Sequence, residues 1–200
     1  MISNTTGHDN AAFGDTVMYS NNTGSGNVAV GKNALYTNTS SNSNTAIGTN
    51  AAYFSTGAEN TAVGNLAGYH LTTGANNILI GNSADNVTTG NGNIVIGNNI
   101  YAAQPGYNNQ LDIGNLLFGR DLDGTGYTLS SGKISVGDFY PGSKFSVTGN
   151  TSIGTVAFSR VAAPTNGLIV EGKVGIGTTS PNAQLTVKTT AGTAMLNITS

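Results

Sequence analysis

Several residue types that stabilise or anchor other proteins are missing or scarce in this 200-residue chain. It has no cysteine and no tryptophan, only four prolines, and charged residues make up 8% of the sequence. Without cysteine, the chain can form neither disulfide bonds nor thiolate zinc sites. Seven lysines and arginines against nine acids, with a net charge of −2, give no basic field, so we expect no nucleic-acid partner.

Long apolar runs are absent as well. No stretch approaches the ~18 consecutive apolar residues of a membrane-spanning helix, so we expect no membrane insertion. Disordered chains usually combine low hydrophobicity with high net charge, whereas 38% of this sequence is apolar and its net charge is only −2. The composition therefore argues against a disordered chain. The abundant residues are 29 glycines, 27 asparagines and 27 threonines, and this composition disfavours helices.

A repeat of 16 or 17 residues fills the first part of the chain. Its marker is the motif Asn-x-apolar-x-Gly, whose glycines are Gly14, Gly31, Gly48, Gly64, Gly81, Gly97 and Gly114. Side chains alternate within each motif with the period of two of a strand, and helical spacing is absent. The sequence therefore predicts an all-β, parallel β-solenoid. Each coil should contain a short strand, a glycine corner, a second short strand and a turn.

The alternation gives the first strand of each coil two faces. We expect the bulkier face to fill the coil core, with the members Val28, Val30, Ile47, Val63, Ile78, Ile80, Ile94 and Ile96. We expect the small-residue face to let a neighbouring chain approach, with the members Ala12, Ala29, Ala46 and Ala62. A third column should stack as an aromatic ladder that sets the coil register, with the members Tyr19, Tyr36, Tyr53 and Tyr69.

The coils are poor in bulky apolar side chains. Ordering the backbone of a 17-residue coil costs more free energy than burying so few side chains returns. We therefore expect the chain to associate with copies of itself. The turn at residues 5–10 matches the closing turn at residues 72–77, so we also expect the chain to be a segment of a longer fibre.

The second half of the chain has a different composition and a different repeat. Asparagine falls from 22 in residues 1–109 to 5 in residues 110–200, while charged residues rise from 5 to 11. Residues 132–137 match residues 172–177, and Pro141 matches Pro181, an offset of 40. We predict a solenoid over 1–119 and two β shaft modules, 120–159 and 160–200. Short strands of several chains should interweave in these modules.

Three further patterns have a functional and a structural interpretation. Asp121 and Asp123 could begin a calcium loop, but no bidentate glutamate follows and a polar turn is favoured. Residues 167–173 have phosphate-loop spacing, but Val174 stands where Ser or Thr would hold magnesium, which favours a turn. His8 and His70 have no nucleophile or acid partner at a recognisable spacing. The sequence therefore predicts no enzyme, no cofactor and no metal site.

Two carbohydrate-related functions remain as alternatives. The tyrosine column could serve as a platform for sugar rings, which would make the chain a carbohydrate-binding solenoid. A glycan-degrading tailspike would need two carboxylates about 5–9 Å apart. Residues 10–110 contain only Asp15, Glu59 and Asp85, and none of these acids share a column.

Two resemblances cover nearly the whole chain. The Asn-x-Ala-Val/Ile-Gly motifs resemble the head repeats of trimeric autotransporter adhesins. Residues 113–119, 123–126 and 174–181 are similar to the shaft of phage-type tail fibres, the type that ends in a chaperone. The resemblance implies an extracellular, homotrimeric, parallel all-β fibre that holds or presents a tip for host or surface attachment. A cell-surface glycan or protein receptor is the partner implied, and phage and bacterial origins both stay open.

Overall fold

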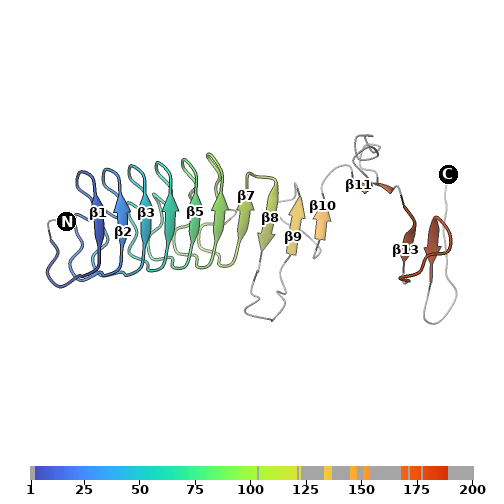
Figure 1. Cartoon of the computed structure of the whole chain (residues 1–200), viewed down its shortest axis with the longest axis horizontal. Coiled ribbons are helices and arrows are strands. Elements are labelled where there is room, and N and C mark those ends of the chain that lie inside the picture. Colours follow the sequence, from blue (N-terminus) through green and yellow to red (C-terminus); the bar gives the residue numbers. More distant parts are fainter. Residues whose placement is uncertain are drawn as a thin grey trace. The chain divides into compact units, whose positions relative to one another are not determined.

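A computed structural model gives the fold of the chain (Figure 1). It describes residues 3–102, 104–120, 122, 133–136, 145–147, 151–153, 168–170, 172–176 and 178–188. Every regular element within these ranges is a β-strand, and none of the described residues belongs to a helix able to cross a membrane. The chain forms two compact units, Met1–Ser146 and Val147–Ser200.

Seven short strands of the first unit pair side by side in parallel and in sequence order. They are β1 (Ala11–Phe13), β2 (Val28–Val30), β3 (Thr45–Ile47), β4 (Thr61–Val63), β5 (Ile78–Ile80), β6 (Ile94–Ile96) and β7 (Leu111–Ile113). Figure 1 shows β1 to β6 as a row of arrows that point the same way. Six parallel pairings join these strands, so the predicted parallel β-solenoid is confirmed and has six turns. Each step is 16 or 17 residues, as the glycine spacing predicts.

The predicted second strand is wrong for the first four coils. Residues after the glycine corner form turns in the first four coils, for example residues 15–20 and 49–54. Their backbone enters the left-handed region at non-glycine positions, including Thr16 (φ 52°) and Met18 (φ 45°). An extended strand requires negative φ throughout, so a chain that bends twice within three residues cannot continue as a strand.

The two faces of the strands are the reverse of the prediction. Ala29, Ala46 and Ala62 are fully buried inside the coils and therefore cannot serve as a chain–chain interface, while Ala12 of β1 is exposed. The residues predicted for the core point outward and are exposed or half-buried. They are Val28, Val30, Ile47, Val63, Ile78, Ile80, Ile94 and Ile96.

A buried column of amides explains the reversal. From Asn27 onward, each motif asparagine donates its backbone N–H to the side-chain oxygen of the asparagine one coil earlier, at 2.9–3.0 Å, as between Asn44 and Asn27 or Asn77 and Asn60. The column is Asn10, Asn27, Asn44, Asn60, Asn77 and Asn93, and Gln110 ends it. Because side chains alternate, an asparagine inside the coil puts the alanine two residues later inside as well, and the bulky neighbours outside.

The parallel solenoid ends at β7, and the sheet continues in antiparallel fashion. β8 (Leu117–Arg120) pairs antiparallel with β7 and with β9 (Lys133–Val136), and β10 (Phe145–Val147) follows β9 in the sheet order. The boundary predicted at Gly119 therefore falls inside β8.

At this end of the solenoid, the inward column of alanine, leucine and valine terminates in a carboxyl group. Asp112 pairs with Val95 and is 1% exposed. One of its oxygens accepts a hydrogen bond from the Asn115 backbone N–H at 3.2 Å, and the other has no partner. Burial raises the pKa of Asp112 above its usual value, and the bond from Asn115 opposes this shift.

Replacing Asp112 by asparagine should therefore stabilise the protein at neutral pH. A raised pKa in the folded state means that the folded chain binds the proton more tightly than the unfolded chain. The stability contributed by this group is thus present at acidic pH and is lost as the pH rises through the folded-state pKa. We expect Asp112→Asn to raise the free energy of unfolding at pH 7 by on the order of 1 kcal/mol. It should also flatten the acidic limb of stability against pH in thermal melts. The exposed Asp15→Asn is the control and should change neither.

The second unit contains two parallel strand pairs within the described residues. β11 (Thr151–Ile153) pairs with β12 (Leu168–Val170), and β13 (Val174–Ile176) pairs with β14 (Leu185–Val187). In the 40-residue repeat, β13 and β14 correspond to residues 134–136 and 145–147, which lie in the sheet neighbours β9 and β10. Both copies therefore pair the strands that flank the proline turn. The further strand predicted at residues 193–198 lies outside the described residues.

Candidate ligand-binding site

The tyrosine column forms a ladder along one side of the solenoid. The rings of Tyr19 and Tyr36 lie 5.0 Å apart with a 6° interplanar angle, and Tyr36 and Tyr53 lie 4.9 Å apart at 2°. Each ring comes from the turn after a glycine corner, so the coil repeat positions one ring above the next. Offset stacking of this kind adds to the stabilisation from buried area.

The regular stack ends at Tyr69. Its ring is tilted by 33° from that of Tyr53, at 5.4 Å. It makes edge contacts with Phe54 and with His70. The fourth tyrosine therefore belongs to the predicted ladder but turns out of the stacking direction, and an imidazole lies beside it.

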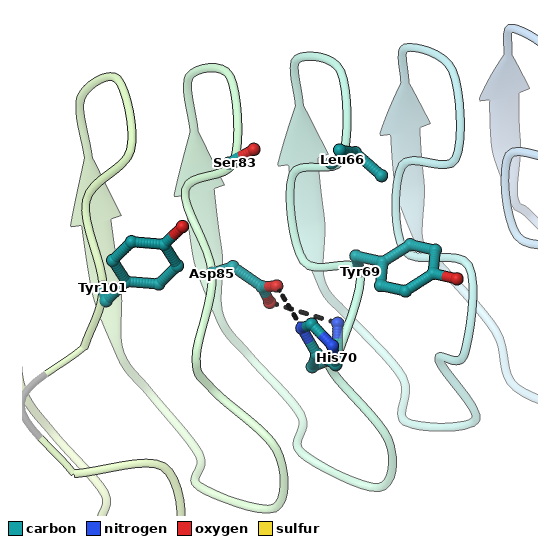
Figure 2. Close-up of a pocket in the computed structure, with 6 residues that line it drawn as sticks. All are labelled: Leu66, Tyr69, His70, Ser83, Asp85 and Tyr101. Carbon is teal, nitrogen blue, oxygen red and sulfur yellow. Dashed lines mark hydrogen bonds and ion pairs between the residues drawn. The ribbon is translucent and has the colours of Figure 1, made fainter.

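The backbone changes conformation in the next coil. Residues in equivalent positions of the first coils, such as Met18, Leu35 and Ala52, have positive φ and are buried. In the following coil, Asp85 instead forms an isolated parallel bridge with Tyr101. The Asp85 side chain is buried and points toward His70 (Figure 2).

His70 and Asp85 form a close hydrogen-bonded pair. Nδ1 of His70 lies 2.6 Å from Oδ2 of Asp85, and the His70 backbone N–H donates to Oδ1 at 3.1 Å. The Asp85 side chain is 5% exposed and the His70 side chain 64% exposed. Nδ1 is thus committed to the carboxylate, and the Nε2 edge of the ring is left toward solvent.

A cavity of about 270 Å³ opens over this pair. Its lining residues are Leu66, Tyr69, His70, Ser83, Asp85 and Tyr101. Figure 2 shows Tyr69 and Tyr101 on opposite sides of the Asp85–His70 pair, which lies between them. The cavity therefore has aromatic walls, an apolar residue at the rim and a polar base.

The site does not assemble a catalytic triad. In Figure 2, Ser83 lies beside Leu66 and apart from the imidazole, and the described residues form no hydrogen bond between Ser83 and His70. A serine nucleophile needs its base within hydrogen-bond reach. The arrangement can bind a ligand through ring faces and hydrogen bonds, but it does not activate this hydroxyl.

The sequence interpretation missed the acid partner of His70. The two residues are 15 positions apart, which in a solenoid of this period places them on adjacent coils. The available signal was the repeat alignment itself, in which an acid replaces the apolar or small residues of the earlier coils. His8 also contacts an acid, Asp9 at 2.8 Å, but both side chains are largely exposed.

The remaining candidate residues contribute nothing to this site. Asp121 and Asp123 lie outside the described residues, as do Gly167 and Glu171 of the phosphate-loop-like segment. Within the described part of the chain, no group of three or more His, Asp or Glu side chains could hold a metal ion.

Comparison with known proteins adds no assignment to this geometry. No protein-family model, no curated protein and no solved structure matches this chain.

Proposed function

We propose that this chain is a structural segment of an extracellular trimeric fibre that holds or presents a surface-binding tip. It would belong to a phage-type tail fibre or a bacterial surface adhesin. The support comes from the outward face of β1–β7, called here the apolar face, together with the resemblance of the repeats to such fibres. The chain's partner in this proposal is itself.

The apolar face consists of two columns of side chains, all of them apolar except Thr45 and Thr61. One column is Ala11, Val28, Thr45, Thr61, Ile78, Ile94 and Leu111, and the other is Phe13, Val30, Ile47, Val63, Ile80, Ile96 and Ile113. None of these positions carries a charge. Phe13 is 76% exposed and Ile47 41%, so the single chain leaves the face in contact with water.

The apolar face is long enough to form a protein–protein interface. At the ~4.8 Å spacing of neighbouring strands, seven strands extend over roughly 29 Å. A contiguous apolar surface on that scale is typical of a protein–protein interface. Because every coil repeats the same narrow, flat pair of columns, identical copies in parallel can bury them around a shared threefold axis.

Light scattering tests this proposal directly. One chain has a mass of 20.1 kDa, and we expect the purified protein to have about three times that mass. Ile80→Glu places a charge in the middle of the apolar face and should give a folded monomer, because Ile80 is already 37% exposed in the single chain. Thr73→Glu, at an exposed turn away from the sheet, is the matched control and should remain trimeric.

Two results would contradict the proposal. One is a wild-type protein that is monomeric and well folded at micromolar concentration, and the other is an Ile80→Glu variant that keeps the trimer mass. Ala46→Glu distinguishes folding from association, because Ala46 is fully buried inside the coil. That substitution should unfold the chain, whereas Ile80→Glu should only dissociate it.

A further inference from the structure

We propose that the cavity between Tyr69 and Tyr101 binds one sugar unit of a neutral glycan. The sugar ring would pack on the tyrosines, and its hydroxyls would hydrogen-bond to the Asp85–His70 pair. This inference rests on the proposed function only in expecting the ligand at a cell surface. The binding itself is a property of this cavity, and four observations carry it.

First, the site lies where the repeat is broken. The coils before it stack one tyrosine on the next, at 4.9–5.0 Å for the first three rings. At Asp85 the left-handed turn is replaced by the bridge to Tyr101. Stacking of the tyrosine column does not require this change. The coil of Asp85 lacks the next tyrosine of the column, and it has an acid where earlier coils have apolar or small residues.

Second, two tyrosines line the same cavity on opposite sides of the Asp85–His70 pair (Figure 2). Tyr69 and Tyr101 come from coils two steps apart, which is about 10 Å at the usual strand spacing. Tyr101 is 50% exposed and Tyr69 half-buried. Tyrosine faces pack against the C–H faces of sugar rings, and the cavity volume of about 270 Å³, just below the roughly 300–1,000 Å³ of drug-sized ligand sites, suits a single sugar unit.

Third, the polar base suits hydroxyl groups. Asp85 uses one position of each oxygen for His70, and a carboxylate offers about four acceptor positions in all. The Nε2 edge of His70 is available for a further hydrogen bond. Hydroxyls both donate and accept, so one sugar can satisfy the acid and the imidazole together.

Fourth, the charges disfavour an ionic ligand. Asp85 is paired with His70, so a cation such as a quaternary ammonium would have to compete with the imidazole for the carboxylate. An anion would lie against the carboxylate itself. No lysine or arginine lines the cavity. A neutral sugar ring neither competes with His70 for the carboxylate nor is repelled by it.

Saturation-transfer NMR with named probes tests the inference. The probes are glucose, galactose, mannose and N-acetylglucosamine with their short neutral oligosaccharides, plus choline and sialic acid as charged probes. We expect at least one neutral saccharide to bind. Tyr101→Ala and Asp85→Asn should each weaken that binding by about tenfold or more.

Tyr107→Ala is the matched control, because Tyr107 is 54% exposed and lies outside the cavity lining. It should leave saccharide binding unchanged. The inference is overturned if no neutral saccharide binds, if Tyr101→Ala and Asp85→Asn bind as the wild type does, or if choline or sialic acid binds instead. Circular dichroism of each variant excludes misfolding, and Tyr101→Ala, at an exposed position, remains informative should Asp85→Asn fail to fold. The oligomeric mass is measured on the same samples, so a wild-type protein that has the trimer mass but binds no neutral saccharide contradicts this inference and leaves the proposed function standing.

Discussion

Replacing Asn60 by leucine should lower the free energy of unfolding by about 3–5 kcal/mol, although the two side chains have similar shapes. Asn60 is buried in the middle of the amide column. Its oxygen accepts from the Asn77 backbone N–H at 3.0 Å, and its Nδ2 donates to the Gly74 carbonyl at 2.9 Å. Leucine leaves both backbone groups buried without a partner, and each orphaned group costs about 1–3 kcal/mol.

The matched control is Asn65→Leu. Asn65 also donates to an asparagine one coil away, Asn82, at 2.9 Å, but on the exposed side of the solenoid. Water replaces that bond, so the control should change the free energy of unfolding by less than about 1 kcal/mol. Chemical denaturation of both variants makes the comparison. Equal losses would show that burial of the amide column does not determine its contribution.

The second large effect is expected at a glycine corner. Gly31 has φ +124°, and a Cβ placed on it would lie 2.6 Å from the carbonyl carbon of Gly48 in the next coil. Gly31→Ala therefore combines a backbone conformation that alanine rarely adopts with a clash against backbone that cannot move aside. We expect a loss of about 3–5 kcal/mol.

Gly26→Ala provides the comparison at another positive φ. Gly26 has φ +67°, and the nearest atom to an added Cβ is 3.8 Å away. Other coils place Asp9, Ser43 or Glu59 at this position. We expect a loss of only about 1 kcal/mol. Thermal melts of Gly31→Ala and Gly26→Ala test this difference. Similar losses of stability in the two variants would mean that close stacking of the coils does not require the corner glycines.

The period of the fold could be predicted because it appears directly in the sequence as a regular spacing of glycines. Gly14, Gly31 and Gly48 recur at the spacing that the parallel pairings then show. The tyrosine column followed from the same alignment, since residues one period apart stack in a solenoid. Both inferences need only chain length per coil and the alternation of side chains.

The direction of the faces could not be predicted from alternation alone. A period of two sorts Val28 and Val30 from Asn27 and Ala29 but does not say which set is inside. Because valine is more hydrophobic than asparagine or alanine, the sequence analysis placed Val28 and Val30 in the core. In the structure Asn27 and Ala29 lie inside the coil. The narrow coil has room for small side chains, and the stacked amides form hydrogen bonds with one another from coil to coil.

By itself, the sequence determined that this protein is a parallel all-β solenoid with glycine corners, since those properties depend on spacing along the chain. Only the tertiary structure decided that the isoleucine and valine columns form an outer surface and that His70 meets Asp85. Both depend on how one coil lies on the next, where the hydrogen bonds of buried amides outweigh the preference of bulky side chains for the interior.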